Sequence, residues 1–142
     1  MPTAYRSNRP VGDFTQEARV RVDFSELTAA ALTETVDLVT LPTGAQISLC
    51  IVDLITTFSD AGSISDLTVE VGTAVTADAF ITSTDVFGPA AGQYRNDGAN
   101  PTASGVLVKA KFTAVGANLG DGATTALDDG LVDIIIRYDV VS

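Results

Sequence analysis

A strict two-residue alternation of apolar and polar side chains recurs along this chain and limits what it can fold into. In "VLVKAKFTA", residues 106–114, apolar side chains occupy the even positions, and lysine or threonine follows between most of them. The stretches 18–24, 67–71 and 132–140 alternate in the same way. Successive side chains of a β-strand point to opposite faces of the sheet. Each stretch therefore predicts a strand with one buried face.

Six segments predict strands in all, and they lie at 18–24, 35–41, 45–58, 66–72, 106–114 and 131–141. A seventh, 76–87, fits a short helix or a strand. The segment 25–35 fits a short helix capped by Ser25, or a loop. The apolar run 45–58 changes phase halfway, which indicates either a central strand covered on both faces or a bulge near Ile51–Asp53.

The order of these elements predicts an all-β fold, an antiparallel β-sandwich. Turn-rich connections join the strands, and no βαβ alternation is present. Long connections favour a jelly roll over a simple meander. Residues 1–17, which contain Pro2, Pro10 and Gly12, predict an extended N-terminal arm, and residues 18–142 predict the sandwich domain. With 46% hydrophobic residues, this length suffices for one buried core.

The chain is strongly acidic, with 8 Lys and Arg against 18 Asp and Glu and a formal net charge of −10. Four arginines make residues 1–21 basic, whereas the rest is acidic. A field of this sign repels nucleic acid and anionic membranes, so neither is a predicted partner. The first residues hold no apolar stretch typical of a secretory signal, and we expect synthesis in a cytoplasm.

Side chains that carry chemistry are scarce. The chain contains no histidine, which removes the usual general base and the commonest metal ligand. Cys50 sits in the most apolar segment and is predicted to be a core residue. Asp53 is expected at a bulge or on a solvent face, and Asp133, which shares its outward face with Arg137, in a salt bridge. We therefore predict that the protein is not an enzyme.

Two glycine-rich segments raise the question of calcium. They supply oxygen ligands at Asn118, Asp121, Asp128 and Asp129. The spacing of an EF-hand is absent, and Asx-Gly pairs are ordinary turn residues. We predict no cofactor, and whether calcium binds near Asp121, Asp128 or Asp129 stays open.

Three stretches together resemble a known group of proteins: "SISDLTVEVGT…DAF…TDVFG", "VKAKFTAVGANL" and the final "GLVDIIIRYDVVS". Over residues 18–142 the chain is similar to small structural proteins of tailed-bacteriophage virions, and most similar to the jelly-roll head decoration, or cement, proteins. The resemblance implies a homotrimer on the outer surface of the phage head that ties neighbouring major capsid proteins together. It places the protein in the virion, after synthesis in the cytoplasm of the bacterial host. A tail or fibre-knob domain and a carbohydrate-binding sandwich module are the alternatives.

Two segments are the candidates for partner contact. A basic, proline-flanked arm can lie extended on a negatively charged partner, and its candidate residues are Tyr5, Arg6, Asn8, Arg9 and Pro10. The polar segment Gly88–Gly105 is too long for a plain connection and too poor in core residues for a subdomain. We expect it to be a contact loop, with Tyr94 and Arg95 as its anchors.

Overall fold

The computed structural model describes residues 16–60, 62–88, 91–95 and 104–140. They form eight β-strands and one short 3-10 turn, Phe24–Glu26. The strands are β1 (Gln16–Asp23), β2 (Thr33–Thr40), β3 (Ala45–Asp60), β4 (Asp66–Gly72), β5 (Ile81–Asp85), β6 (Gly92–Arg95), β7 (Leu107–Val115) and β8 (Leu127–Val140). Within these ranges no helix has the length and apolar character needed to cross a membrane.

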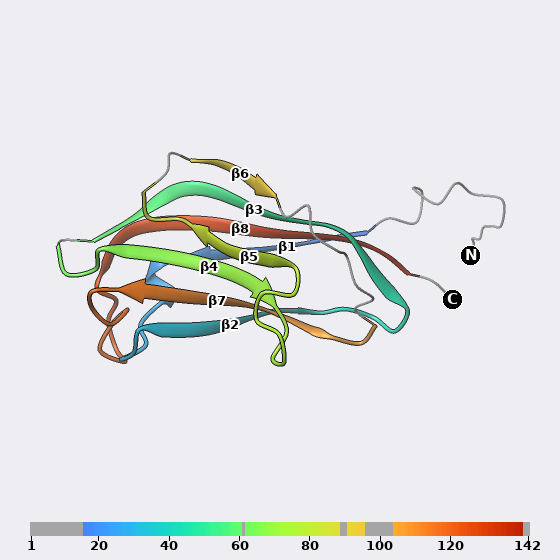
Figure 1. The fold of residues 1–142 in the computed structure, drawn as a ribbon, viewed down its shortest axis with the longest axis horizontal. Coiled ribbons are helices and arrows are strands. Elements are labelled where there is room, and N and C mark those ends of the chain that lie inside the picture. Colours follow the sequence, from blue (N-terminus) through green and yellow to red (C-terminus); the bar gives the residue numbers. More distant parts are fainter. Residues whose placement is uncertain (1–15, 61, 89–90, 96–103, 141–142) are drawn as a thin grey trace.

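The strands build two four-stranded sheets, ordered β1-β8-β3-β6 and β2-β7-β4-β5, which pack as two layers (Figure 1). Every pairing is antiparallel, which confirms the predicted all-β antiparallel sandwich. The pairs are also nested: β1 lies beside β8, β2 beside β7, β3 beside β6 and β4 beside β5. This nesting supports the narrower assignment as a jelly roll, which stays a prediction.

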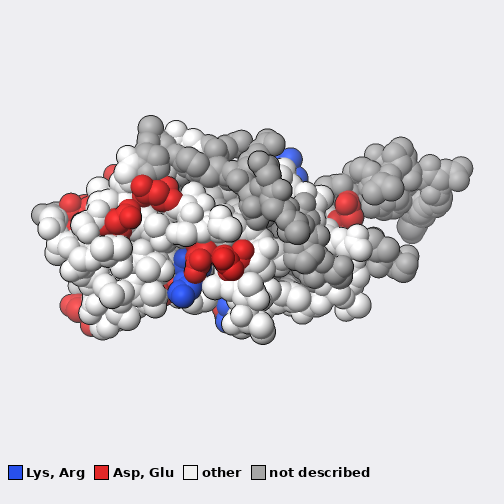
Figure 2. Space-filling view, viewed as in Figure 1, with Lys and Arg blue, Asp and Glu red and all other residues white. Residues whose placement is uncertain are grey.

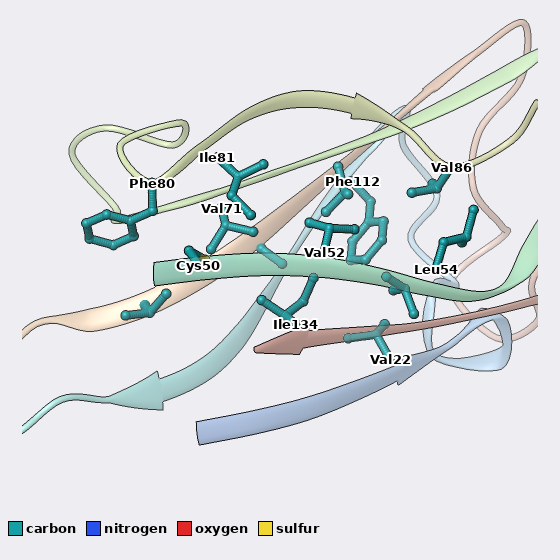
Figure 3. Packing of buried hydrophobic residues seen from close by; sticks show 14 of the residues in the cluster. Val22, Cys50, Val52, Leu54, Val71, Phe80, Ile81, Val86, Phe112 and Ile134 are labelled. Atoms are coloured by element: carbon teal, nitrogen blue, oxygen red, sulfur yellow. The ribbon is translucent and has the colours of Figure 1, made fainter. Parts of the chain in front are cut away.

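The core lies between the sheets and is built from the apolar half of each alternating strand. The inward prediction for Val108, Ala110 and Phe112 is confirmed, since all three are fully buried. Figure 3 shows such side chains converging from both layers. The rings of Phe58 on β3 and Phe112 on β7 join the layers, with centroids 6.2 Å apart and planes tilted by 46°. Removal of this apolar surface from water is the main term that favours folding.

Gly130 of β8 lies directly against Phe58 of β3. Its φ of 142° lies where side chains other than hydrogen are strained. A Cβ at this position would overlap the ring of Phe58. The backbone amide of Phe58 donates to the carbonyl of Val86 at 2.9 Å, and the amide of Val86 donates to the carbonyl of Leu67 on β4 at 3.0 Å. Val86 therefore ties the two sheets together here.

The structure explains the phase change within β3. Ala45 and Ile47 belong to the core cluster, as do Cys50 and Val52, so the inward positions change from odd to even numbers between Ile47 and Cys50. The register with β8 shifts at this place, between Ile47 and Leu49, so the change of phase comes from a bulge that lies before the predicted Ile51–Asp53. Ile51 is buried as well although it lies outside the core cluster, so β3 also buries a side chain on its other face there, as the first explanation predicted.

Three ambiguous segments are now assigned. The doubtful seventh segment contains a strand, β5. The segment after β1 holds only the 3-10 turn, and its cap is Asp23, which accepts from the Ser25 amide, rather than the predicted Ser25. The prediction of an uninterrupted loop over Gly88–Gly105 was wrong, because β6 pairs there with β3. A strand of four residues in a polar, glycine-rich stretch gives almost no periodic signal.

Candidate partner-binding surface

The outer face of the β1-β8-β3-β6 sheet carries buried apolar side chains although it faces away from the core. Ile135 of β8 lies in register between Arg19 of β1 and Ile51 of β3. Ile51 and Ile135 are 2% and 1% exposed, respectively, and neither belongs to the core cluster. Long arginine side chains can cover apolar neighbours with their aliphatic stems while the guanidinium reaches water. At Ile51 and Ile135, β3 and β8 therefore bury side chains on the outer face of the sheet as well as on the core face.

Asp133 is a buried carboxylate on this outer face, 1% exposed. Arg21 binds it with two donors, Nε to Oδ1 at 2.8 Å and Nη2 to Oδ2 at 3.1 Å. Arg19 Nη1 donates to Oδ2 at 3.2 Å. These contacts, the Arg21 hydrogen bond first, hold the pKa of Asp133 below its usual range, against the opposing effect of burial. The salt bridge expected for Asp133 is present, but its partners lie on β1.

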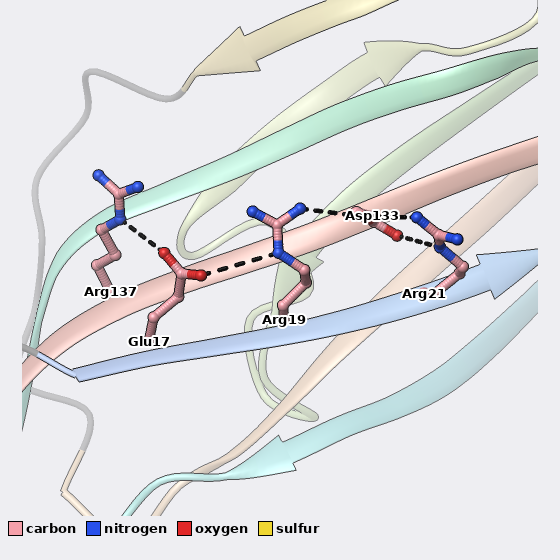
Figure 4. A network of polar contacts seen from close by, with 5 residues as sticks. All are labelled: Glu17, Arg19, Arg21, Asp133 and Arg137. Carbon is pink, nitrogen blue, oxygen red and sulfur yellow. Dashed lines mark hydrogen bonds and ion pairs between the residues drawn. The ribbon is translucent and has the colours of Figure 1, made fainter.

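Arg137, which shares the outward face of β8, pairs instead with Glu17 of β1. Arg137 Nε lies 3.0 Å from Glu17 Oε1, and Glu17 Oε2 lies 3.8 Å from Arg19 Nε. The five side chains therefore form a continuous ladder along β1 and β8 (Figure 4), which we call the arginine ladder: Glu17, Arg19, Arg21, Asp133 and Arg137. The ladder joins the edge strand β1 to the centre of its sheet.

Two carboxylates stand directly opposite each other beside the ladder. Asp53 of β3 is in register with Asp133 of β8 on the outer face. Asp53 is half-buried there, which agrees with the predicted position on the outer face of a strand. Like charges in this position repel, and the guanidinium of Arg21 offsets them. A carboxyl whose pKa is lowered stays ionised near neutral pH, so Asp133 is unsuited to act as a general acid. The geometry fits a structural ion pair.

The outer face of the β2-β7-β4-β5 sheet is polar and holds a hollow of about 310 Å³, the lysine pocket. It is lined by Thr35, Thr73, Ala74, Ala77, Lys109 and Lys111. The two lysines, neighbours on the outer side of β7, hold loose ion pairs: Lys109 Nζ to Asp37 Oδ1 at 3.4 Å and Lys111 Nζ to Glu70 Oε1 at 4.0 Å. In Figure 2 basic atoms near the centre of the view lie beside acidic ones. In the sequence, the only signal of this pocket is the pair of lysines on one strand face, and the pattern of residues alone did not predict it.

The predicted contact residues are only partly within the described structure. Tyr94 and Arg95 lie on β6, an edge strand of its sheet, with their backbones opposite Val52 and Ile51 of β3. The arm residues fall outside the described ranges: Tyr5, Arg6, Asn8, Arg9 and Pro10. Their role in partner contact stays a prediction.

The remaining candidates for chemistry have structural roles. Cys50 is buried in the core as predicted, and burial raises the pKa of its thiol to about 12. Asp121 Oδ1 accepts from the amides of Thr124 at 2.7 Å and Ala123 at 2.9 Å, which lowers the pKa of Asp121. Asp129 Oδ1 accepts from Gly130. Among the described residues, no three His, Cys, Asp or Glu side chains are grouped to hold a metal ion.

Comparison with known proteins gives a match in structure only. No family model and no curated protein matches the chain. A chain of the cyanophage Pam1 capsid asymmetric unit superposes with a TM-score of 0.65 at 17% identity, covering 99% of this chain and 100% of that one. A chain of the acid-stable capsid of Helicobacter pylori bacteriophage KHP30 superposes with a TM-score of 0.59 at 17% identity, covering 90% of this chain and 89% of that one. A chain of the Ralstonia phage GP4 capsid superposes with a TM-score of 0.58 at 17% identity, covering 99% of this chain and 90% of that one. The chain thus shares its fold, over nearly its whole described length, with chains of three phage capsids.

Proposed function

We propose that this protein is a non-enzymatic structural component of a phage virion, a decoration protein on the outer surface of the head. One observation carries the proposal: the similar chains come from three phage capsid structures, and the match covers 89–100% of each. Those chains are therefore about as long as this one, and the shared sandwich makes up nearly all of each.

The proposed partners are the major capsid protein and further copies of this chain in a homotrimer. The basic arm would lie on an acidic part of the shell, where charge complementarity and ordering of an extended segment give affinity. The rigid sandwich would span neighbouring capsid subunits and stabilise their contacts. Nucleic acid and membrane play no part in this proposal, since the net charge of −10 repels both.

The first test is purification of virions and quantitative mass spectrometry of their proteins. We expect this chain in assembled heads, in a copy number that is a fixed multiple of the lattice sites. Light scattering of the isolated protein should give the mass of a trimer at micromolar concentration. A strict monomer that is absent from heads contradicts the proposal, and labelling confined to tails in particle images would move it to the tail.

Deletion of residues 1–12 tests the arm. The deletion ends before β1 begins at Gln16, so the sandwich keeps all of its strands. We expect a urea unfolding midpoint equal to that of the full chain, together with weaker binding to heads stripped of the protein. Equal binding by both forms would remove the arm from the mechanism.

A further inference from the structure

We propose that the lysine pocket binds a carboxylate, and that in the assembled particle this is an Asp or Glu side chain of the partner protein. The identity of the partner rests on the proposed function, whereas the carboxylate chemistry rests on the pocket alone. Lys109 and Lys111 are the only two lysines of the chain, and both line the same hollow.

The register of the sheet places the two lysines on one face of β7, with Lys109 paired toward β2 and Lys111 toward β4. Lys109 and Lys111 are two residues apart on β7, so their stems leave the same face about 7 Å apart. Lys111 lies opposite Thr35 of β2, and the hydroxyls of Thr35 and Thr73 add hydrogen-bond donors to the lining. A volume of about 310 Å³ is at the lower end for ligand pockets, and it suits one side chain better than a large molecule.

The loop that forms the wall is held by its own hydrogen bonds. The Thr73 amide donates to the Thr76 carbonyl at 2.8 Å, and the Thr76 amide donates to Thr73 Oγ1 at 3.1 Å. Gly72, where the loop leaves β4, is so close to the carbonyls of Thr76 and Ala77 that a Cβ would overlap them. The wall is therefore fixed before any ligand arrives, which lowers the entropy cost of binding.

The tip of the same loop favours a protein as the source of the carboxylate. Val75 is 96% exposed, the most exposed of the large apolar side chains described. An apolar side chain next to a charged hollow gives a protein partner a second contact that a free small acid would not use. The pocket and Val75 together suit an acidic residue flanked by an apolar one.

The ion pairs of the two lysines are long, so an incoming carboxylate can compete with them. Both are longer than the 2.8 Å contact between Arg21 and Asp133. The lysine side chains are only 27% and 39% exposed, so the pocket walls already shield them partly from water. A lysine ammonium is a compact charge on a flexible stem and can turn from one oxygen to another. Asp37 and Glu70 then compete with the incoming carboxylate for the lysines. Removal of either resident charge should therefore raise the affinity of the pocket for a carboxylate ligand.

The experiment is a titration of the isolated protein, followed by amide NMR shifts, with an acetylated and amidated triglutamate peptide at low salt. Triglutamine serves as the uncharged probe. We expect shifts confined to residues 72–77 and 108–112 with the glutamate peptide and none with the glutamine peptide. Lys109→Gln and Lys111→Gln should each weaken binding several-fold, and Asp37→Asn should strengthen it about two- to fivefold, as expected for one exposed ion pair.

Arg137→Gln is the matched control, because it removes one positive charge from the opposite outer face. It should leave the titration within twofold of the unmodified protein. Equal losses in Arg137→Gln and Lys109→Gln, or shifts along the arginine ladder instead of the pocket, would overturn the proposal. Urea midpoints of all variants show whether a loss of binding comes from unfolding.

Binding to stripped heads tests the partner. If the unmodified chain binds, we expect the double variant, which carries both Lys109→Gln and Lys111→Gln, to bind at least tenfold more weakly than Arg137→Gln. Equal binding by these variants refutes the protein-carboxylate assignment. If the unmodified chain does not bind heads, the proposed function fails, and the peptide titration still decides the chemistry of the pocket.

Discussion

The outer faces of the two sheets differ although both sheets have four antiparallel strands over one shared core. The face of β1-β8-β3-β6 carries buried isoleucines and a buried aspartate that is paired with two arginines. On the other sheet, three successive outward positions of β7 carry Lys109, Lys111 and Thr113, all partly exposed. Figure 4 shows the charged side chains of the first face linked into a ladder, and Figure 2 shows basic atoms beside acidic ones near the centre of its view.

This difference separates a face that stabilises from a face that can bind. On the arginine-ladder face, donors and acceptors are already used within the chain, and truncation of a side chain there removes native contacts. On the lysine-pocket face, the ion pairs are long and only partly buried, so the same kind of truncation changes stability little. Matched substitutions on the two faces measure how far the separation holds.

The largest expected contrast is between Ile135→Ala and Thr113→Ala. Ile135 is 1% exposed, so its loss leaves a cavity, and we expect the free energy of unfolding to fall by about 3 kcal/mol. Thr113 lies at an outward, partly exposed position of β7, where the loss should stay below about 1 kcal/mol. Urea unfolding followed by circular dichroism gives both values. Similar losses for both variants would remove the distinction between the faces.

Asp133→Asn and Glu70→Gln form the second contrast. Asparagine keeps the shape of Asp133 but loses its charge-assisted hydrogen bonds to Arg19 and Arg21, and we expect a loss of about 2 kcal/mol. Glu70 contacts Lys111 only at 4.0 Å, and its substitution should cost less than about 0.5 kcal/mol. If Asp133→Asn leaves the free energy of unfolding unchanged, the ladder contributes only packing to stability.

The pH dependence of the same pair sharpens this result. The folded pKa of Asp133 is lowered, so its contribution is complete above its unfolded pKa of about 3.9 and is lost as pH falls through the folded value. The unfolding free energies of the native chain and Asp133→Asn should therefore differ by a constant amount from pH 5 to 8. The difference should shrink below about pH 4. A difference that is the same at pH 3 and pH 7 would contradict the ion pair.

The alternation of side chains was sufficient to predict the sandwich and most of its strands. Each long strand buries one face, and hydrophobic period alone reveals that. It could not reveal β6, which has four residues and is defined by its pairing with β3 rather than by its composition. Nor could it reveal that Gly130 meets Phe58, because that contact joins residues distant in sequence.

The candidate site was less accessible from sequence because it depends on strand register. The outward position of Asp133 was predicted from alternation, but its arginine partners follow from the pairing of β1 with β8. The lysine pocket needs the loop after β4 to stand beside β2 and β7, and no local pattern encodes that arrangement. The contact residues of the arm and Tyr94 with Arg95 came from charge and composition, and they stay predictions.

The smallest expected effect is the reactivity of Cys50, which reports on both faces at once. Its thiol lies in the core with a pKa of about 12, so it should not react with a maleimide in the native state at pH 7. Slow labelling then measures transient opening of β3. Ile135→Ala should speed labelling, because the outer face of the same sheet is weakened, whereas Lys109→Gln should leave the rate unchanged. Equal rates in both variants would mean that the two outer faces contribute alike to holding β3 closed.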